Sequence, residues 1–596
     1  MCGIVGQWNK YDKIDRSLFN RMRDTLVHRG PDGYGSYFAE DINVALGHRR
    51  LAFIDLSDKA RQPFCNEDST IWATVNGEIY NYKQLREELE LKGHRFASRC
   101  DSETIVHAYE QWGIDMVNKL EGMFAFAIWD SNVRKIFIAR DKFGIKPLFY
   151  YYDNEKLIFA SEIKAIVENS AVQRKINYRS MCEYFYYRYV PSPNTIFENI
   201  YKVEPAHYIE FSDVDKFIDV EYYKFQTAEN TISQKQLVED INEMLSESVK
   251  KHIQSDVPIG SFLSGGYDSS LLVKYFSDRQ KGFNTYSIGF DGWQKSEHQY
   301  AEQVSRIFGT NHRSLILDDI SLDVLKGLMY YYDDPIADIS IIPTYLVSKE
   351  ASKYNKAVLS GEGADELFAG YTWHKKYLWT IPWWQEIAYK IKGWELPLNN
   401  FDIDSYARVT EMGKFDGDAL RDLLLEKLHT YIPEDKDAFF RKFFDKHLPT
   451  PKRFQMLDIK CFMAELVLTK VDRASMANSL EVRVPFLNTG IFEKMLSLSP
   501  DVYFNPRKQK VVIYKILKKY IPREIIARKK QGFVGPDSYY MNFDWYRKCL
   551  TNSSLVKDGI IRRSAIDKYL DDKDHWRLWK IAVFEMWYRQ WMSNNG

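Results

Sequence analysis

The stretch Ser264-Gly265-Gly266-Tyr267-Asp268-Ser269-Ser270 joins an apolar run, Val257–Leu263, to a helical pattern over Leu271–Phe276. The apolar run predicts a buried strand, and Ser269 or Ser270 can cap the helix. The glycines let the backbone turn tightly and approach a ligand, while the helix N-terminus attracts an anion. We therefore predict a phosphate-binding loop in which Asp268 can hold magnesium. An ordinary turn is the alternative, and the loop lacks the Walker pattern with its lysine.

Strand-like and helical segments alternate after this loop, which predicts a parallel sheet covered by helices. The strands are expected at Asn284–Phe290, Ser314–Leu317 and Lys356–Leu359, and the helices at Glu297–Phe308 and Ile342–Tyr354. Ligands collect at the carboxyl ends of such strands, where the last strand runs into Ser360-Gly361-Glu362-Gly363-Ala364-Asp365. Asp268 and Asp365 can share one magnesium ion, because this cation prefers oxygen ligands. A solvated acidic loop is the alternative.

The N-terminal half begins Met1-Cys2-Gly3 and is rich in strand-like runs. A cysteine left at the N-terminus by loss of methionine carries its own base, the α-amine; the alternative is a small buried side chain. Asn76-Gly77 ends a predicted strand and can present a side-chain amide beside a backbone N–H, as an oxyanion hole requires; a hairpin turn is the alternative. The guanidinium of Arg50 suits a carboxylate, although an unliganded surface arginine has the same appearance in sequence.

The chain has 596 residues, enough for two or three domains, with 82 Lys plus Arg against 82 Asp plus Glu. This balance favours neither nucleic acid nor an acidic membrane as a partner. The six cysteines are scattered and contain no Cys-x-x-Cys, which argues against a disulfide framework or a zinc site. No apolar run reaches about 18 residues, so a membrane span is not expected. We expect a cytoplasmic enzyme that acts on small molecules.

Several motifs resemble one family. The S-G-G-x-D-S loop resembles the pyrophosphatase loop of enzymes that form acyl-adenylates, and Met1–Gly6 resembles the start of class II glutamine amidotransferases. His28–Gly33, Asn76–Asn81 and Lys470–Leu487 match further signatures, and the set resembles glutamine-hydrolysing asparagine synthetase. The resemblance implies an α/β and α+β protein of two domains. Residues 1–210 would form an αββα nucleophile-hydrolase sandwich, and residues 211–596 a parallel-sheet domain of the ATP-pyrophosphatase type with helices.

The resemblance also implies roles for individual residues. The catalytic group is Cys2 as nucleophile, Asn76 and Gly77 as oxyanion hole, and Glu362 as the base for ammonia. Glutamine would contact Arg50, Asn76, Glu78 and Asp101. ATP would contact Leu263, Ser264, Gly265, Gly266, Asp268, Ser269, Ser270, Ile288, Ser360 and Gly361. Magnesium would be held by Asp268 and Asp365, and pyrophosphate by Lys470 or Arg473, which share a helix face.

The implied reaction is glutamine-dependent synthesis of asparagine. Glutamine is hydrolysed through a thioester, ammonia passes inside the protein, and ATP-Mg converts aspartate to β-aspartyl-AMP, which ammonia attacks. Departures from the family pattern at Tyr267, Ala369 and Val534 border the acceptor motifs, so a nucleotide-linked uronic acid is the alternative acceptor. A non-catalytic glutamine-sensing paralogue would be expected to lose Cys2 or Asp268, and both are present. A homodimer is possible.

The clustered tryptophans of residues 371–394 and 575–591 favour buried helix faces over helices at a membrane surface, because neither segment has a clean charged side.

Overall fold

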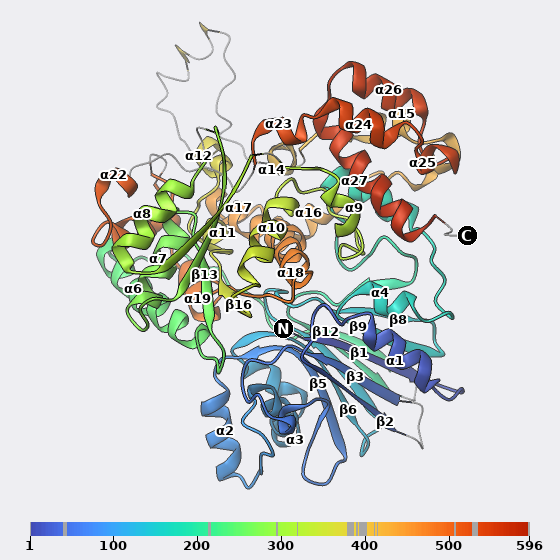
Figure 1. The fold of residues 1–596 in the computed structure, drawn as a ribbon, viewed down its shortest axis with the longest axis vertical. Helices are drawn as coiled ribbons and strands as arrows, with labels where there is room; N and C mark the ends of the chain where they lie inside the picture. Colours follow the sequence, from blue (N-terminus) through green and yellow to red (C-terminus); the bar gives the residue numbers. More distant parts are fainter. Residues whose placement is uncertain are drawn as a thin grey trace.

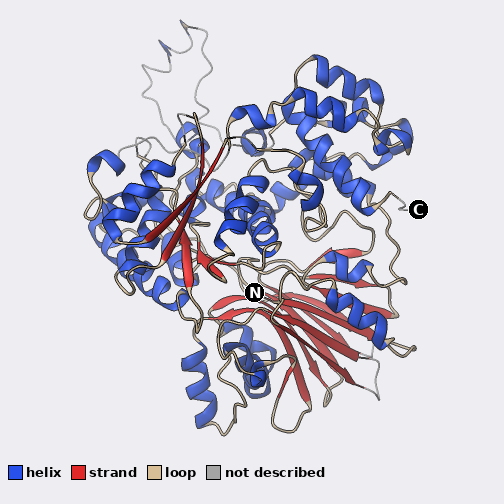
Figure 2. Ribbon diagram, viewed as in Figure 1, coloured by secondary structure: helices blue, strands red, loops and turns tan. Residues whose placement is uncertain are grey.

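A computed structural model describes residues 2–39, 44–212, 216–293, 296–318, 320–377, 387–388, 391–392, 402–410, 412–413, 415–505, 508–526 and 535–593. Its N-terminal part is an antiparallel sandwich and its C-terminal part is a parallel sheet with helices, as predicted (Figure 1). Figure 2 separates the strand-rich half from the helix-rich half.

The sandwich is built from two six-stranded antiparallel sheets. The first has the order β10 (Ile200–Lys202), β8 (Phe149–Tyr152), β9 (Lys156–Ala160), β1 (Gly3–Asn9), β3 (Val44–Arg50), β2 (Gly33–Ala39). The second has the order β12 (Lys216–Glu221), β11 (His207–Ser212), β7 (Lys135–Arg140), β6 (Gly122–Asp130), β5 (Ile71–Ile79), β4 (Phe64–Cys65). The second sheet thus continues past the boundary predicted near residue 210.

Helices cover both outer faces, which makes the sandwich four-layered. The helices α1 (Arg16–Asp24) and α4 (Ile163–Val167) contact the first sheet, and α3 (Thr104–Trp112) contacts β5 while α2 (Tyr82–Leu91) packs on α3. Successive side chains of each strand point to opposite faces of its sheet, so one strand contributes to two hydrophobic cores. On β6, Phe124, Phe126 and Ile128 face the core beneath α2 and α3, whereas the intervening residues, among them Trp129, fill the core between the sheets.

Two N-terminal elements are shorter than their sequence pattern predicts. Apolar residues at helical spacing predict a helix over Arg16–Val27, and the run Gly47–Asp55 predicts a strand, but the helix ends at Asp24 and the strand at Arg50. The chain leaves β3 because the guanidinium of Arg50 donates hydrogen bonds to the carbonyls of Asp55 and Ser57, which folds residues 51–57 around it.

The prolines and short aromatic runs of residues 171–230 predict the edge of the first domain followed by a linker, and the segment also contains a helix, α5 (Tyr178–Tyr187). It leads to α6 (Gln234–His252), the first long helix of the C-terminal part. Beyond this helix lies a parallel sheet in the order β15 (Asn311–Leu317), β14 (Asn284–Phe290), β13 (Ile259–Phe262), β16 (Ala357–Leu359), β17 (Glu481–Arg483). The sequence did not predict β17.

The strand order determines where a ligand can bind. The chain runs outward from β13 to β14 and β15, then returns to β16 on the other side of β13. With right-handed crossovers, α7 (Tyr267–Ser277) and α8 (His298–Phe308) cover one face, and α10 (Ile341–Ala351) and α18 (Leu468–Met476) cover the other. The topological switch point therefore lies between β13 and β16, at whose carboxyl ends ligands bind in such sheets.

The remaining helices surround this sheet or form the upper right of Figure 1. They are α9 (Val324–Leu328), α11 (Ala364–Leu367), α12 (Thr372–Tyr377), α14 (Ile403–Thr410), α15 (Gly417–Leu423), α16 (Ala438–Phe443), α17 (Thr450–Leu457), a π-helix (Asp458–Val467), α19 (Thr489–Leu496), α20 (Pro500–Tyr503), α21 (Val511–Leu517), α22 (Arg523–Ile526), α23 (Asp537–Tyr540), α24 (Phe543–Leu550), α25 (Ser554–Lys557), α26 (Arg563–Asp571) and α27 (His575–Trp591). The aromatic helix α27 is buried along most of its length, as predicted. Most of the aromatic segment 371–394 lies outside the described residues.

Candidate active sites

Cys2 lies next to Asn76, although 74 positions separate them in the chain. Its backbone nitrogen donates a hydrogen bond to Asn76 Oδ1 at 3.0 Å, because β1 and β5 belong to facing sheets of the sandwich. Its thiol Sγ lies 3.9 Å from the carbonyl of Leu51. Burial raises the pKa of the Cys2 thiol, so the sulfur is protonated at neutral pH and needs a base to act as a nucleophile.

Gly77 follows Asn76 on β5, where the backbone approaches β6 very closely. A Cβ atom at this position would lie 2.1 Å from the carbonyl oxygen of Met123, so a side chain cannot fit unless the strands move apart. The amide nitrogen of Asn76 also lies 3.5 Å from Ser161 Oγ. The strand therefore presents Asn76 and a glycine beside the cysteine.

Two carboxylates lie close together, Glu78 near the end of β5 and Asp101 at the start of the helical turn Asp101–Glu103. Asp101 accepts a hydrogen bond from the N–H of Ile79 at 2.8 Å, which places it beside Glu78 on the same strand end. Burial raises the pKa of both groups, the charge of Asp101 raises that of Glu78 further, and Arg483 opposes this rise at both. A cationic α-amine brought between the two would relieve their repulsion.

Arg50 lies at the end of β3 and its guanidinium is engaged by the 51–57 loop, as described above. If Arg50 binds the α-carboxylate of glutamine, as predicted, it would use the guanidinium N–H groups that do not donate to the carbonyls of Asp55 and Ser57.

The predicted phosphate loop connects β13 to α7 as a compact turn. Ser264 Oγ lies 3.1 Å from Ser269 Oγ and accepts a hydrogen bond from the N–H of Gly266 at 3.2 Å. Gly265 has φ +71°, and a Cβ there would lie 2.8 Å from the backbone of Tyr300 on α8. Gly265 therefore meets both requirements, a left-handed backbone and close packing, that favour glycine.

The second loop meets the first at the switch point. A Cβ on Gly361 would lie 3.0 Å from that of Asp268, so the backbones are in contact. Asp268 and Asp365 converge on the Nζ atom of Lys510; Asp365 Oδ1 is 2.8 Å away, and Asp268 Oδ2 forms a second contact. The two carboxylates raise the pKa of this lysine against the effect of its burial.

Lys510 was not predicted, because it lies 242 residues beyond Asp268. The available signal was weak: two lysines, Lys508 and Lys510, precede the apolar helix α21.

The convergence of Asp268 and Asp365 on Lys510 also shows whether these residues suit a magnesium ion. Two aspartates that already neutralise one cationic atom supply the hard oxygen donors that this ion requires, so the residues fit it.

Glu362 lies between the two loop glycines Gly361 and Gly363. Its Oε2 atom is buried and has no hydrogen-bond partner among the residues that the structure describes. Leu263 and Ile288 were predicted to contact ATP. Leu263 directly follows β13, Ile288 lies on the neighbouring parallel strand β14, and the N–H of Leu263 donates to the carbonyl of Tyr286 at 2.8 Å. Both side chains are buried.

Lys470 and Arg473 lie on α18 but have different partners. The guanidinium of Arg473 is buried and pairs with Glu162 at 2.8 Å and Asp333 at 3.0 Å. Because Glu162 belongs to the sandwich, Arg473 forms part of a contact between the two halves. Lys470 Nζ instead donates to Ser340 Oγ at 3.1 Å, at the start of α10.

The departures from the family pattern lie in distinct surroundings. Tyr267 Oη donates to the carbonyl of Ile526 at 2.7 Å, and Ala369 has φ +54°, a left-handed backbone that glycine adopts more readily. Val534 and the basic-Gly-Phe element Lys529–Phe533 lie outside the described residues.

The antiparallel sandwich and the parallel sheet thus define a two-domain protein, in which the candidate site around Cys2 lies on the sandwich and the candidate site at Ser264–Ser270 lies on the parallel sheet. Comparison with known families agrees. Residues 1–223 match the model described as glutamine amidotransferase domain, and residues 240–589 match that described as asparagine synthase.

Named relatives extend over nearly the whole chain. Asparagine synthetase [glutamine-hydrolyzing] 1 of Bacillus subtilis is 32% identical and the alignment covers 99% of this chain and 96% of the relative. A putative asparagine synthetase of Mycobacterium tuberculosis is 30% identical over 96% and 93%. Amidase chry2 of Gibberella zeae is 26% identical over 92% and 90%. The chain belongs to the glutamine-hydrolysing asparagine synthetase family.

Along the part of the chain that the structure describes, every helix is too short or too polar to cross a membrane.

Proposed function

We propose that this protein is a glutamine-dependent ligase that amidates a carboxylate at the expense of ATP, and that the carboxylate is the side chain of aspartate. The observation that carries the proposal is the convergence of Asp268, Asp365 and Lys510 at the switch point, in a chain that also holds Cys2 against Asn76. The first cluster suits a nucleotide phosphate with its cation, and the second suits an amide carbonyl.

In the sandwich, Cys2 attacks the side-chain carbonyl of glutamine. Once Met1 is removed, the α-amine of Cys2 takes the proton from the thiol and returns it to the departing ammonia. Asn76 and the N–H of Gly77 stabilise the oxyanion, while Arg50 holds the α-carboxylate and Glu78 with Asp101 holds the α-amine. Water then hydrolyses the thioester and releases glutamate.

In the C-terminal domain, the acceptor carboxylate attacks the α-phosphorus of ATP and pyrophosphate leaves. Magnesium held by Asp268 and Asp365 would neutralise phosphate charge during this transfer. The backbone of the Ser264–Ser270 loop binds phosphate oxygens, and Lys510 adds a positive charge to them. The nucleotide lies between the side chains of Leu263 and Ile288, and Ser360 and Gly361 contact it. Glu362 then takes a proton from the attacking ammonia, and AMP leaves as the amide forms.

Lys470 is the better candidate for pyrophosphate. Arg473 already pairs with two buried carboxylates, and breaking a buried pair would cost several kcal/mol, roughly 3–5. Lys470 donates its hydrogen bond to a hydroxyl at 3.1 Å, which a phosphate oxygen could replace at lower cost, although its charge also lowers the pKa of the nearby Asp338. We propose that the domain boundary follows β12, at about residue 223, and not the predicted residue 210, because β12 belongs to the sandwich. The expected compartment is the cytoplasm, in which the six free cysteines would stay reduced.

Aspartate is proposed because relatives aligned over nearly the whole chain are named asparagine synthetases. The test is acceptor-dependent release of pyrophosphate, with glutamine and ATP supplied. Aspartate should support release, and nucleotide-linked uronates should not, because a site built around specific polar contacts rejects compounds lacking them by about 10⁴–10⁵-fold. Release with a uronate and none with aspartate would overturn the acceptor while leaving the amidotransferase chemistry in place.

A further inference from the structure

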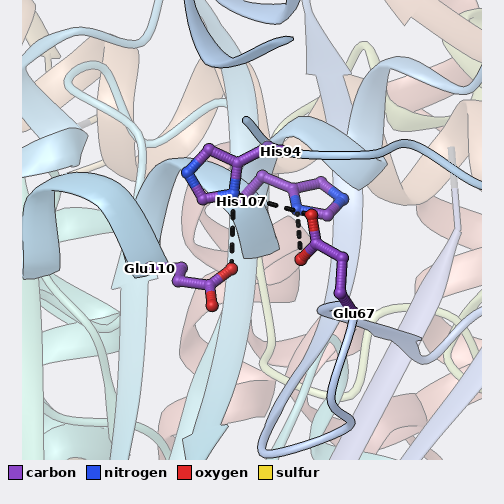
Figure 3. Close-up of side chains that lie close together, drawn as sticks. All are labelled: Glu67, His94, His107 and Glu110. Carbon is purple, nitrogen blue, oxygen red and sulfur yellow. Dashed lines mark ion pairs between the residues drawn. The ribbon is translucent and has the colours of Figure 1, made fainter. Parts of the chain in front are cut away.

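Four side chains that the proposed reaction does not use meet on the outer layer of the sandwich (Figure 3). Glu67 lies in the turn between β4 and β5, His94 follows α2, and His107 and Glu110 are one turn apart on α3. Each offers one nitrogen or oxygen atom, and the four atoms all lie within 4.8 Å of one another. Three separate segments of chain thus converge on one point.

The distances suit a shared metal ion better than ion pairs. His94 Nδ1 lies 3.4 Å from Glu110 Oε2 and 3.8 Å from Glu67 Oε1, and His107 Nδ1 lies 3.5 Å from Glu67 Oε2. Charged hydrogen bonds are shorter, about 2.7–2.9 Å. Zinc ligands at about 2.0–2.2 Å in a tetrahedron are separated from each other by about 3.3–3.6 Å. These three separations are therefore close to those of ligands around one ion, and the full set, whose atoms all lie within 4.8 Å, would contract slightly on binding.

The surroundings of the Nε2 atoms of His94 and His107 bear on whether their Nδ1 atoms can bind a metal. His94 Nε2 lies 3.3 Å from Gln111 Oε1, and His107 Nε2 lies 3.7 Å from Glu103 Oε1. A proton on His94 Nε2 facing Gln111 leaves the lone pair of its Nδ1 directed at the shared point, whereas 3.7 Å is too long for a hydrogen bond at His107. Metal-binding histidines are commonly held this way, by a second oxygen behind the ring.

His107 supplies an independent observation. Its side chain is only 1% exposed, and neither ring nitrogen makes a hydrogen bond of normal geometry within the described part of the chain. A buried imidazole without such bonds costs free energy unless another ligand satisfies it. The carboxylates are also held in place, because Glu67 accepts from the N–H of Arg95 at 2.6 Å and Glu110 from Asn66 Nδ2 at 3.0 Å.

We propose that Glu67, His94, His107 and Glu110 bind a zinc ion as a structural site with four protein ligands. Two neutral imidazoles and two carboxylates balance the charge of Zn²⁺, and imidazole with carboxylate is a donor set that zinc accepts. The cysteine pattern argued against zinc, but this site contains no cysteine. The ion would join α3 to the turn before β5, the strand that carries Asn76 and Gly77.

The test uses the full chain, stripped with a chelator, reloaded with zinc sulfate, desalted and assayed for zinc by mass spectrometry. Glu110→Gln and His94→Asn each remove one ligand from a partly exposed position, so both variants should fold, as circular dichroism would verify. Glu87→Gln is the matched control, because it makes the same change at an exposed position of α2. Cobalt(II) serves as a spectroscopic probe of tetrahedral coordination.

We expect about one zinc per chain in the wild type and the control, with zinc affinity at least about 100-fold weaker in the two ligand variants. Zinc should also raise the melting temperature of the wild type and the control only, because an ion that binds only the folded state stabilises it. Equal zinc retention in all four proteins would place the ion elsewhere and overturn the proposal. Failure of the wild type to retain zinc, or a cobalt spectrum without tetrahedral character, would also overturn it.

Discussion

The guanidinium of Arg483 lies 3.0 Å from the Glu78 carboxylate, and both groups are buried. Arg483 belongs to β17 of the parallel sheet, and Glu78 belongs to β5 of the sandwich. The carbonyl of Arg483 also accepts a hydrogen bond from the N–H of Ser360 at 2.9 Å. The side chain of Arg483 therefore contacts Glu78, which is proposed to bind glutamine, and its backbone contacts Ser360, which is proposed to bind the nucleotide. The two proposed sites are thus linked through one residue.

Replacing Arg483 by methionine should destabilise the protein by about 3–5 kcal/mol, since it leaves buried carboxylates without their cation. The free energy of urea unfolding measures this. Arg61→Met is the control at an exposed arginine, and it should change stability by less than about 1 kcal/mol. Arg483→Lys, which keeps the charge but not the fork, should fall between them. Equal stability of the two methionine variants would show that the pair does not hold the domains together.

Cys2→Ala should abolish glutamine-dependent amide synthesis and leave synthesis from added ammonium close to the wild-type rate. The reason is that, in the proposed mechanism, the thiol is needed only to release ammonia, and the proposed ATP site lies on the parallel sheet of the other domain. Product formed with each nitrogen source is the measurement. The two-site interpretation would be wrong if both activities fell together in a folded variant.

Lys510→Met should lower acceptor-dependent pyrophosphate release by about 10²–10³-fold, the effect expected when a preorganised positive group is removed. Asp268→Asn and Asp365→Asn should lose the same activity, because a neutral amide cannot replace a carboxylate that binds a divalent cation. Basal glutaminase activity serves as the internal control in each variant and should persist. Pyrophosphate release at the wild-type rate in Lys510→Met would remove this lysine from the site.

Glu362→Gln should separate the two half-reactions. If this residue is only the base for ammonia, ATP–pyrophosphate isotope exchange should continue with acceptor present, while amide formation falls by about 10²–10⁴-fold. Loss of exchange would instead assign Glu362 to nucleotide or metal binding.

Glu366 should give the stability of the protein a distinctive dependence on pH. Burial, with Asp365 next to it, raises the pKa of Glu366 to about 8, although a hydrogen bond from Tyr371 opposes the rise. An unfolded glutamate titrates near 4.3. Between these values the folded state holds a proton that the unfolded state has released, so this group makes stability fall as pH rises through the window.

Glu366→Gln should therefore reduce that fall, because the amide keeps an oxygen for Tyr371 but does not titrate. The measurement is the free energy of unfolding at several pH values between about 4.3 and 8. Glu426→Gln, at an exposed glutamate, should leave the slope as in the wild type. An unchanged slope in Glu366→Gln would show that its carboxyl is not the group responsible.

Helices and strands were predictable from the sequence where the hydrophobic periodicity and the flanking turn residues agree. Periodic apolar residues predict a helix over Tyr82–Leu91, and glycines at 282 and 292 flank the strand predicted over Asn284–Phe290; both elements have these bounds in the structure. The Ser264–Ser270 loop and the Ser360–Asp365 loop were predicted to meet, because the carboxyl ends of the strands in a parallel sheet lie at one edge. Local patterns failed for β17, because two of its three residues, Glu481 and Arg483, are charged, whereas the equally short β16 is apolar throughout.

The sequence by itself thus determined the order of the domains, the family and the two candidate sites, because these depend on short motifs and on residues close together in the chain. Only the tertiary structure decided the partners of long charged side chains. Lys510 lies between two aspartates, Arg473 pairs with Glu162 of the sandwich, and Arg483 reaches Glu78 across the domain contact. The physical reason is that burial makes pairing obligatory for a charge without specifying the partner, which depends on which strands and helices pack together.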